Sequence, residues 1–374
     1  MTTRPRLTPA MADVRRAVRD ALALVYPDAR DGVHRDPSCG APGGWVVPED
    51  APLVLVALSG GPDSLALAVA LGFERGKCGV RAGAVIVDHG LQEGSAEIAE
   101  RAAEQARAAG LNPVVVRRVA VRDEGGGPEA DARAARYAAF GDVARETGAT
   151  AVLIGHTLDD QAETVLLGLA RGSGARSLAG MRLVSHRSFA HDAKADPAEQ
   201  ELAIVRPLLG LRRSIVAQSL IDQGIEPWID PHNADPSFAR IRVRANVLPV
   251  LEAELGPGVA EALARTAEQL TDDADLLDAL AHEIVAQAIT PLGQLDVIEL
   301  DGRHVALTSR VIRIWLSANL PDYISIHAHI VAVRELVTAW TGQAAIDIPG
   351  GVVAREGNLL LIRRTTLAED SSGV

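Results

Sequence analysis

A loop that carries hydroxyl, glycine and carboxylate groups follows the uninterrupted apolar run Leu53 to Leu58. The run predicts a strand buried on both faces, and residues 65 to 72 then follow helical spacing. Glycines let the backbone approach a ligand closely, and a proline suits the first helical turn. The free N–H groups of that turn and the helix dipole favour a bound phosphate. We therefore expect a phosphate cradle made by Ser59, Gly60, Gly61, Pro62, Asp63 and Ser64.

This loop differs from the two common nucleotide-binding motifs. It has no Gly-x-x-x-x-Gly-Lys-Ser/Thr pattern and so no lysine for a γ-phosphate, and it has no Gly-x-Gly-x-x-Gly pattern. The P-loop NTPase and dinucleotide-binding classes are therefore disfavoured. A plain strand-to-helix turn is the simplest alternative, but six consecutive positions fit a phosphate cradle and favour the latter.

A second group of polar residues follows a later predicted strand. Asp159 and Glu163 are four residues apart, and Asp160 and Glu163 are three apart, so their carboxylates share one side of a helix. Acids in a first helical turn also suit the helix dipole, which is a capping interpretation. Capping explains one acid but not three acids beside His156. A Mg²⁺ site held by Asp63 and Asp160 is the sharper hypothesis.

Two weaker signals lie nearby in the predicted fold. His89 closes a strand where it would suit nucleotide contact, although a lone histidine is ordinarily a satisfied polar group. Arg133 and Arg136 are neighbours on one face of a predicted helix. Either Arg133 forms a surface ion pair with Glu129, or one of the two arginines reaches a phosphate. The residues alone leave both interpretations open.

Alternating strands and helices must position these groups. The predicted strands are Leu53–Leu58, Val80–Val87, Pro113–Val119, Ala151–Ile154 and Ala203–Arg206. Five strand–helix units predict an α/β fold with a parallel five-stranded Rossmann-like sheet and helices on both faces. Ligands of such sheets bind beyond the carboxyl ends of the strands, and the polar motifs fall there.

The rest of the chain is arranged around this sheet. We predict an N-terminal helix and linker over 1–50, the sheet domain over 51–230, a helical segment over 231–295 and a small α+β domain over 296–374. The polar stretch 184–201 predicts a mobile insert loop, in which His186 and His191 lack a third metal ligand. Val305–Leu307 predicts a strand of the last domain.

The composition disfavours several classes of function. The 374 residues carry a net charge of −12, which argues against indiscriminate nucleic-acid binding but permits a local basic patch. Cys39 and Cys78 form no Cys-x-x-Cys pair, so zinc and redox sites lack support. No apolar stretch approaches a membrane span, and no signal-peptide pattern is present. We expect a cytoplasmic protein; its oligomeric state stays open, with a homodimer as one option.

With these motifs in order, the chain resembles the tRNA(Ile)-lysidine synthetase family of the N-type ATP pyrophosphatases. The resemblance covers about residues 53 to 250. Its motifs are Leu58–Ser64, Asp88–Leu91, Glu129–Tyr137, Gly155–Thr164, Arg171–Gly174, Arg206–Leu209, Asp230–Asp235, and Phe238–Arg244 with Pro249. The family often has Arg-Asn where Arg240 here precedes Ile241.

The resemblance implies a two-step reaction. ATP adenylates O2 of the wobble cytidine in tRNA(Ile) with a CAU anticodon, and the ε-amino group of free L-lysine then displaces AMP to form lysidine. It implies ATP contacts at residues 59 to 64, His89 and His156. It implies catalytic roles, with Mg²⁺, for Asp63, Arg133, Asp160 and Glu163, of which Arg133 would clamp a phosphate or the adenylate. The residues expected to contact tRNA are Arg171, Asn233, Arg240, Arg242 and Arg244.

Three alternatives stay open. A tRNA-modifying relative that makes 2-thiocytidine would need cysteines for sulfur or a cluster, and Cys39 and Cys78 are poorly placed for that. A free-nucleotide or amide-forming synthetase is disfavoured because no glutaminase-like segment is present. A non-catalytic ATP-binding module is disfavoured by the acids Asp63, Asp160 and Glu163.

Overall fold

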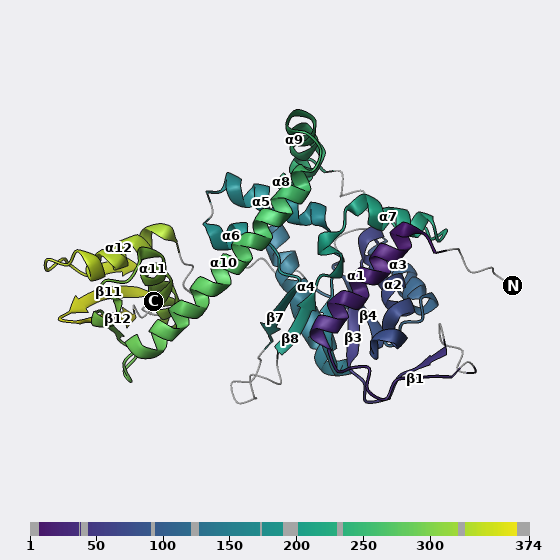
Figure 1. Ribbon diagram of the computed structural model, residues 1–374, viewed down its shortest axis with the longest axis horizontal. Helices are drawn as coiled ribbons and strands as arrows, with labels where there is room; N and C mark the ends of the chain where they lie inside the picture. The colour runs from purple at the N-terminus through teal and green to yellow at the C-terminus, as the bar shows by residue number, and fades with distance from the viewer. Residues whose placement is uncertain are drawn as a thin grey trace, which may run out of the picture. The chain divides into compact units, whose positions relative to one another are not determined.

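The computed structural model describes residues 7–36, 38, 44–90, 94–120, 127–172, 174–189, 201–229, 235–320 and 326–364 (Figure 1). The chain forms two compact units, Met1–Glu268 and Gln269–Val374, and passes from one to the other within helix α10 (Val259–Ala288). The finer four-part division stays a prediction. No helix in the described ranges is long and apolar enough to cross a membrane.

A six-stranded sheet in the order β5-β4-β3-β6-β8-β7 forms the centre of the first unit (Figure 1). Five strands are parallel: β3 (Leu53–Ala57), β4 (Arg81–Asp88), β5 (Val114–Arg118), β6 (Ala149–Leu153) and β8 (Glu201–Val205). The predicted α/β fold with five parallel strands is therefore confirmed, with one strand more than expected.

The additional strand corrects the prediction that residues 184–201 form only an insert loop. Strand β7 (Val184–Ser188) runs antiparallel to β8, with Val184 opposite Val205 and Ser188 opposite Glu201. An edge strand has one neighbour and needs no apolar alternation, so its polar sequence concealed it. Residues 190–200, with His191, lie outside the described residues.

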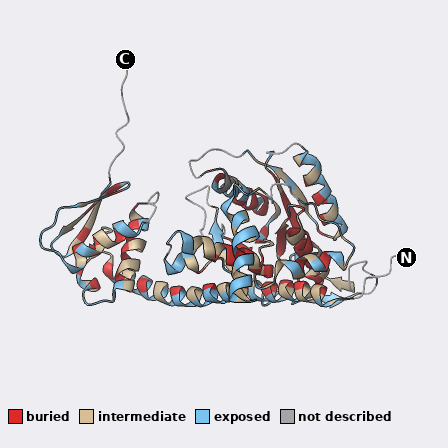
Figure 2. Ribbon diagram, turned by 90° about the horizontal axis from the view of Figure 1, so that it is seen from above, coloured by how far each residue is buried: buried red, intermediate tan, exposed pale blue. Residues whose placement is uncertain are grey.

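The alternation of strand side chains gives the sheet two buried faces. Val54 and Val56 of β3 pack against one set of helices, whereas Leu53 and Leu55 pack against helix α4 (Pro128–Thr147). The helices on the first face are α1 (Pro9–Val25), α2 (Pro62–Cys78), α3 (Ser95–Ala108) and α7 (Arg213–Ile221). Figure 2 shows buried residues concentrated in the strands and on the inward sides of these helices.

Shorter elements complete the first unit. They are β1 (His34–Arg35), β2 (Trp45–Val46), α5 (Leu158–Ala170), α6 (Ala175–Leu178), the 3₁₀ turn Pro207–Gly210, α8 (Ala239–Arg242), the π-helical turn Val243–Val247 and α9 (Leu248–Leu255). The helical segment predicted to follow the sheet is therefore present. Helix α5 packs on it through Leu158 and Ala162, which contact Leu248 and Ala260.

The second unit is the predicted small α+β domain. Its elements are β9 (Leu295–Asp296), the 3₁₀ turn Ile298–Leu300, α11 (Val305–Asn319), α12 (His327–Thr338), β10 (Ile346–Ile348), β11 (Gly351–Glu356) and β12 (Leu359–Arg364). The strands form an antiparallel sheet in the order β10-β11-β12-β9. Trp315 is fully buried at the centre of the core, and its indole N–H donates to the Gly293 carbonyl at 2.8 Å.

The predicted strand at Val305–Leu307 is wrong, because helix α11 begins at Val305. His304 caps this helix: its Nδ1 accepts a hydrogen bond from the Ala306 N–H at 3.2 Å. A three-residue apolar run fits a strand and a helix equally well, so periodicity alone could not distinguish them.

Gly79 tests the packing of α2 against the N-terminal segment. It ends α2 at a φ of +70°, and a Cβ there would lie 1.8 Å from the Ala29 carbonyl oxygen. Gly148 ends α4 at a φ of +71° with nothing within 4 Å, so it is a matched control. We expect Gly148→Ala to lower the free energy of unfolding by about 1 kcal/mol, from backbone strain alone. Gly79→Ala should lower it by about 3 kcal/mol, because a steric clash is added. Equal losses in urea titrations would contradict this packing.

Candidate functional site

The loop between β3 and α2 has the shape of an anion cradle. Gly60 adopts a φ of +81°, and Gly61 is the N-cap of α2, with Pro62 in the first turn. The serines hold the loop from within: Ser64 Oγ donates to the Gly61 carbonyl at 3.1 Å and lies 3.1 Å from Ser59 Oγ. No side chain caps the start of α2, so its first-turn amides remain available to a ligand.

A glycine brings the second motif against this loop. A Cβ on Gly155 would lie 2.9 Å from the Asp63 carbonyl carbon and 3.0 Å from the Ser64 nitrogen, so only glycine allows this approach. The turn after β6 therefore packs directly on the start of α2. Residues nearly a hundred positions apart in the sequence meet at the carboxyl edge of the sheet.

Asp160 caps helix α5, as the capping interpretation expects, and also faces a cluster of charged side chains. Its Oδ2 accepts hydrogen bonds from the Thr157 N–H and hydroxyl, both at 2.8 Å, and completes a capping box at the start of α5. Its Oδ1 lies 2.9 Å from Arg213 and 3.4 Å from Arg244. One oxygen thus builds the helix end, and the other faces the polar cluster.

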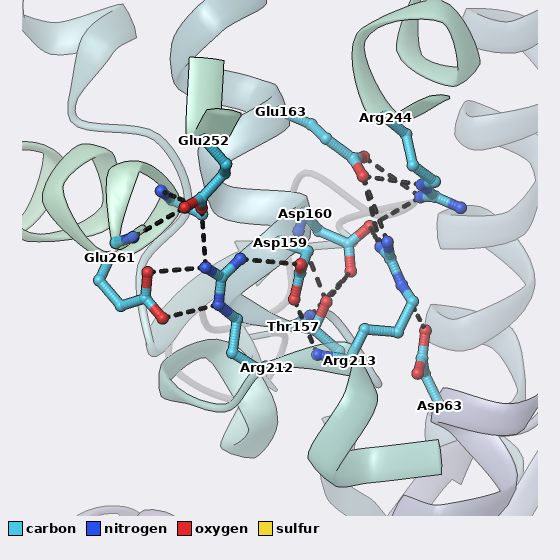
Figure 3. Close-up of polar contacts among 12 residues, drawn as sticks. Asp63, Thr157, Asp159, Asp160, Glu163, Arg212, Arg213, Arg244, Glu252 and Glu261 are labelled. Atoms are coloured by element: carbon cyan, nitrogen blue, oxygen red, sulfur yellow. Dashed lines mark hydrogen bonds and ion pairs between the residues drawn. The ribbon is translucent and has the colours of Figure 1, made fainter. Parts of the chain in front are cut away.

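Three acids and three arginines form this cluster, and Figure 3 labels all of them except Arg240. Its members are Asp63, Asp160, Glu163, Arg213, Arg240 and Arg244. Fully buried Glu163 accepts from Arg244 at 2.8 Å and also pairs with Arg240 at 3.2 Å and Arg213 at 3.4 Å. Arg213 bridges the two motifs, since it contacts both Asp63 at 3.4 Å and Asp160 at 2.9 Å. The opposite charges offset the desolvation of the buried carboxylates.

The two aspartates on either side of Arg213 have different pKa values. Burial raises the pKa of Asp63 to about 6, and its one long contact with Arg213 offsets this only in part. Burial also acts to raise the pKa of Asp160, but Arg213 and the Thr157 N–H outweigh it and lower that pKa. Asp63 Oδ1 has no hydrogen-bond partner among the described residues.

A second ion-pair group lies beside the first one. Arg212 pairs with Asp159 at 3.2 Å, Glu252 at 2.8 Å and Glu261 at 2.6 Å, and so ties α5 to α9 and α10 (Figure 3). Asp159 also accepts from the Arg213 backbone N–H at 2.7 Å. Asp159 therefore holds the start of α7 in place. Sequence analysis missed both Arg212 and Arg213, although the pair directly follows the Arg206–Leu209 motif.

The other predicted nucleotide-site residues lie around this cluster. Burial lowers the pKa of His156 to about 3 and also lowers the pKa of His89, so both rings are neutral at pH 7. The Nδ1 atoms of both rings lack hydrogen-bond partners in the described ranges. Arg133 lies with its guanidinium carbon 5.0 Å from the centre of the Tyr137 ring and donates to the Tyr137 hydroxyl at 3.3 Å.

The five predicted tRNA-contacting residues differ in their surroundings. Arg240 and Arg244 turn toward Glu163, and Arg240 also donates to the Thr164 hydroxyl at 2.7 Å. Arg171, at the end of α5, is exposed, as is Arg242, which donates to backbone carbonyls nearby. Asn233 lies outside the described residues.

The carboxylates fit a magnesium ion that is shared with a nucleotide. Among the described residues, no three His, Cys, Asp or Glu side chains form a set that could hold a metal by themselves. Mg²⁺ needs no such set, because it is commonly bound by one or two carboxylates together with phosphate oxygens and water. The unpartnered Oδ1 of Asp63, across Arg213 from Asp160, is a suitable hard oxygen donor.

Comparisons with known proteins match both units. A PP-loop domain model matches residues 44–251, and a TilS substrate binding domain model matches residues 295–361. A tRNA(Ile)-lysidine synthase from Leifsonia xyli subsp. xyli is 50% identical over 353 residues, which cover 93% of this chain and 98% of that protein. This chain belongs to the tRNA(Ile)-lysidine synthase family. The Streptomyces coelicolor tRNA(Ile)-lysidine synthase is 46% identical over 95% of this chain and 99% of its own length.

One solved structure shows how far the fold extends beyond the lysidine synthase family. The U34-tRNA thiolase NcsA from Methanococcus maripaludis, with its 4Fe-4S cluster, matches with a TM-score of 0.50. The match covers 70% of this chain and 80% of that one at 18% identity. At this identity the likeness concerns the fold alone.

The raised pKa of Asp63 predicts how stability depends on pH. Between about pH 4 and pH 6 the folded protein binds a proton at Asp63 that the unfolded chain releases, so the stability contributed by this group falls as pH rises. In metal-free buffer, Asp63→Asn should therefore be more stable than the unaltered protein at pH 7, by up to about 3 kcal/mol, with no difference below pH 4. Urea titrations across this range measure the difference.

Asp160→Asn is the matched control with the opposite sign. The pKa of Asp160 is lowered in the fold, so its charge contributes stability above the ordinary aspartate pKa that is lost as pH falls. This variant should be less stable than the unaltered protein at pH 7, with a deficit that shrinks on acidification. A pH-independent difference for Asp63→Asn would contradict the raised pKa.

Proposed function

We propose that this protein ligates lysine to C2 of the wobble cytidine of tRNA(Ile) with a CAU anticodon, with conversion of ATP to AMP and pyrophosphate. The observation that carries the proposal is the meeting of the Ser59–Ser64 cradle with Asp160 and Glu163 at one edge of the sheet. The family supports ATP and tRNA(Ile) as substrates. Lysine as the amine is the more specific part of the proposal.

The first step replaces a poor leaving group with a good one. Cytosine O2 attacks the α-phosphate of ATP, the bond from that phosphorus to the bridging oxygen breaks, and pyrophosphate leaves. First-turn amides of α2 stabilise the pyrophosphate, and Arg133 is the candidate clamp for the α-phosphate. Asp63 and Asp160 would hold Mg²⁺, which stabilises negative charge on the phosphates. His89 and His156, both neutral, would line the ATP site.

The second step brings an amine to the activated carbon. The lysine ε-amino nitrogen attacks C2 of the cytidine, and AMP leaves with the oxygen that had been O2. Asp160 and Glu163 supply the negative charge that attracts the ammonium form of lysine, which releases a proton to water before its nitrogen attacks C2. In the free protein that charge is matched by Arg213, Arg240 and Arg244, so the amine must replace part of these contacts.

The tRNA would contact arginines near this cluster. A guanidinium has five N–H donors, so Arg240 and Arg244 can pair with Glu163 and still contact phosphate. Arg171, Arg242 and Asn233 keep their predicted tRNA-contacting roles. We place the reaction in the cytoplasm, in keeping with a chain of only two cysteines.

A 2-thiocytidine synthase is the alternative within the same superfamily. Such chemistry needs an accessible sulfur carrier or a cluster held by cysteines. Cys78 is buried in α2, and burial raises its pKa to about 11, which disfavours the reactive thiolate. Cys39 lies outside the described residues. The two cysteines therefore give no support to a thiolase reaction.

Substrate dependence of pyrophosphate release tests the proposed reaction. We expect sustained release from ATP only when tRNA(Ile) with a CAU anticodon and L-lysine are both present, because each step consumes one of them. The control is the same tRNA with a different wobble nucleotide. Release without tRNA, in the presence of a small acid, would contradict the lysidine assignment and favour a small-molecule synthetase.

Substitution of Asp63 tests the magnesium assignment. Asp63→Ala should lower the adenylation rate about a hundredfold or more, because a ligand of the charge-stabilising ion is lost, while the fold stays intact by circular dichroism. The control is Asp142→Ala, which removes a half-exposed acid that pairs with Arg145 on α4, away from the acid cluster. Full activity of Asp63→Ala across a Mg²⁺ titration would overturn the assignment.

A further inference from the structure

Three arginines near strands β7 and β8 and helix α4, namely Arg206, Arg187 and Arg133, have no acidic partner among the described residues. Arg206 follows β8 and is only 6% exposed. Its Nη1 donates to the Arg182 carbonyl at 2.9 Å and the Ser185 hydroxyl at 3.0 Å, whereas its Nε has no partner among the described residues. No carboxylate in the described part of the chain pairs with it.

Two exposed arginines lie beside this buried one. The guanidinium carbon of Arg187 lies 4.2 Å from the centre of the buried Tyr137 ring, and that of Arg133 lies 5.0 Å from the same ring. Arg187 is on β7 opposite Leu202, which faces α4, so Arg187 and Tyr137 share this face of the sheet. Among the described residues, neither Arg187 nor Arg133 forms an ion pair.

This arrangement is costly in the free protein. A buried guanidinium ordinarily has an acidic partner, and adjacent like charges add repulsion. Burial lowers the pKa of Arg206, and the charges of Arg133 and Arg187 lower it further, while Tyr137 opposes the shift. In the acid cluster every arginine faces a carboxylate. Unbalanced positive charge in one place points to an anion that binds from outside.

The sheet order separates this anion from the ATP phosphates. The phosphate cradle follows β3, whereas Arg206 follows β8, two strands away, and Arg187 lies on β7, three strands away. At about 4.8 Å per strand the separations across the sheet are roughly 10 and 14 Å, and Arg187, opposite Leu202, also lies four residues along the strands from Arg206. The side of the site beyond β6 is therefore the place for the second substrate, whose chain of phosphodiesters carries the matching charge.

We propose that Arg187, above the buried positive charge of Arg206, binds a tRNA phosphodiester next to the wobble cytidine. The inference rests on the proposed function, since it needs tRNA as the second substrate. Arg187 makes the contact because it is exposed and, in the part of the chain that the structure describes, is held by the Tyr137 ring without an ion pair. Buried Arg206 increases the positive electrostatic potential at Arg187, because charges interact more strongly in the low-dielectric interior. Arg133, beside both, lies between this subsite and the α-phosphate that it is proposed to clamp.

Binding of an anticodon stem-loop RNA with the CAU anticodon tests the subsite. Arg187→Gln should weaken binding about tenfold and reduce the slope of log affinity against log salt by about 1, while ATP affinity is unchanged. Arg187→Lys should restore most of the slope because it keeps the charge. The matched control is Arg117→Gln on the opposite edge strand β5, where Arg117 pairs with Glu146 at 2.5 Å. This variant should bind RNA as the unaltered protein does.

A neutral methylphosphonate at each phosphate that flanks the wobble cytidine locates the contact. One of these replacements should weaken binding to the unaltered protein about tenfold, yet have little further effect on Arg187→Gln, because the two changes remove the same interaction. Independent, additive losses would overturn the proposal, as would lost ATP affinity with an unchanged RNA salt slope.

If the unaltered protein does not bind this RNA, the proposed function itself fails; if it binds and Arg187→Gln binds equally well, only the subsite fails.

Discussion

Arg213 holds together two acids that would otherwise repel each other. Asp63 begins α2 and Asp160 begins α5, and the guanidinium between them contacts both. Without it, two desolvated carboxylates at adjoining helix starts would raise each other's pKa, and one would take up a proton. The remaining difference between Asp63 and Asp160 fits this account, because Asp63 has only the longer contact. The geometry of the carboxyl edge thus depends on an arginine from a third element.

The same contact explains how the site exists before its ligands bind. The positive charge that Mg²⁺ would bring to these carboxylates is supplied in the free protein by Arg213, with Arg240 and Arg244 at Glu163. Binding of Mg²⁺ would then replace the guanidinium groups as partners of the carboxylates, so the carboxylates would be paired with positive charge both before and after binding. A guanidinium released in this way would be free to contact the phosphates, because its fork of N–H donors suits their oxygens.

Local spacing explains which parts of the site were predictable. The cradle and the Asp160–Glu163 pair lie within single strand–helix junctions, where glycine, proline and helical spacing specify geometry over a few residues. Arg212 and Arg213 depend on partners 40 to 150 positions away, and no local pattern indicates such pairs. Strand β7 was missed for a related reason: its pairing comes from β8, while its own sequence lacks strand alternation. Capping does not exhaust the role of Asp160, because one carboxylate oxygen caps α5 while the other contacts Arg213.

Balanced and unbalanced charges occupy different parts of the site, although the whole chain has a net charge of −12. Acids balanced by arginines adjoin the cradle for a nucleotide, whereas Arg206 and Arg187 have no acidic partners among the described residues. His156 is neutral, so it adds no charge to either group. A polyanion approaching a mostly acidic protein is repelled except where positive charge is unbalanced. RNA would therefore be guided to the β7–β8 side, which leaves the cradle after β3 to ATP and brings the base and the α-phosphate together between them.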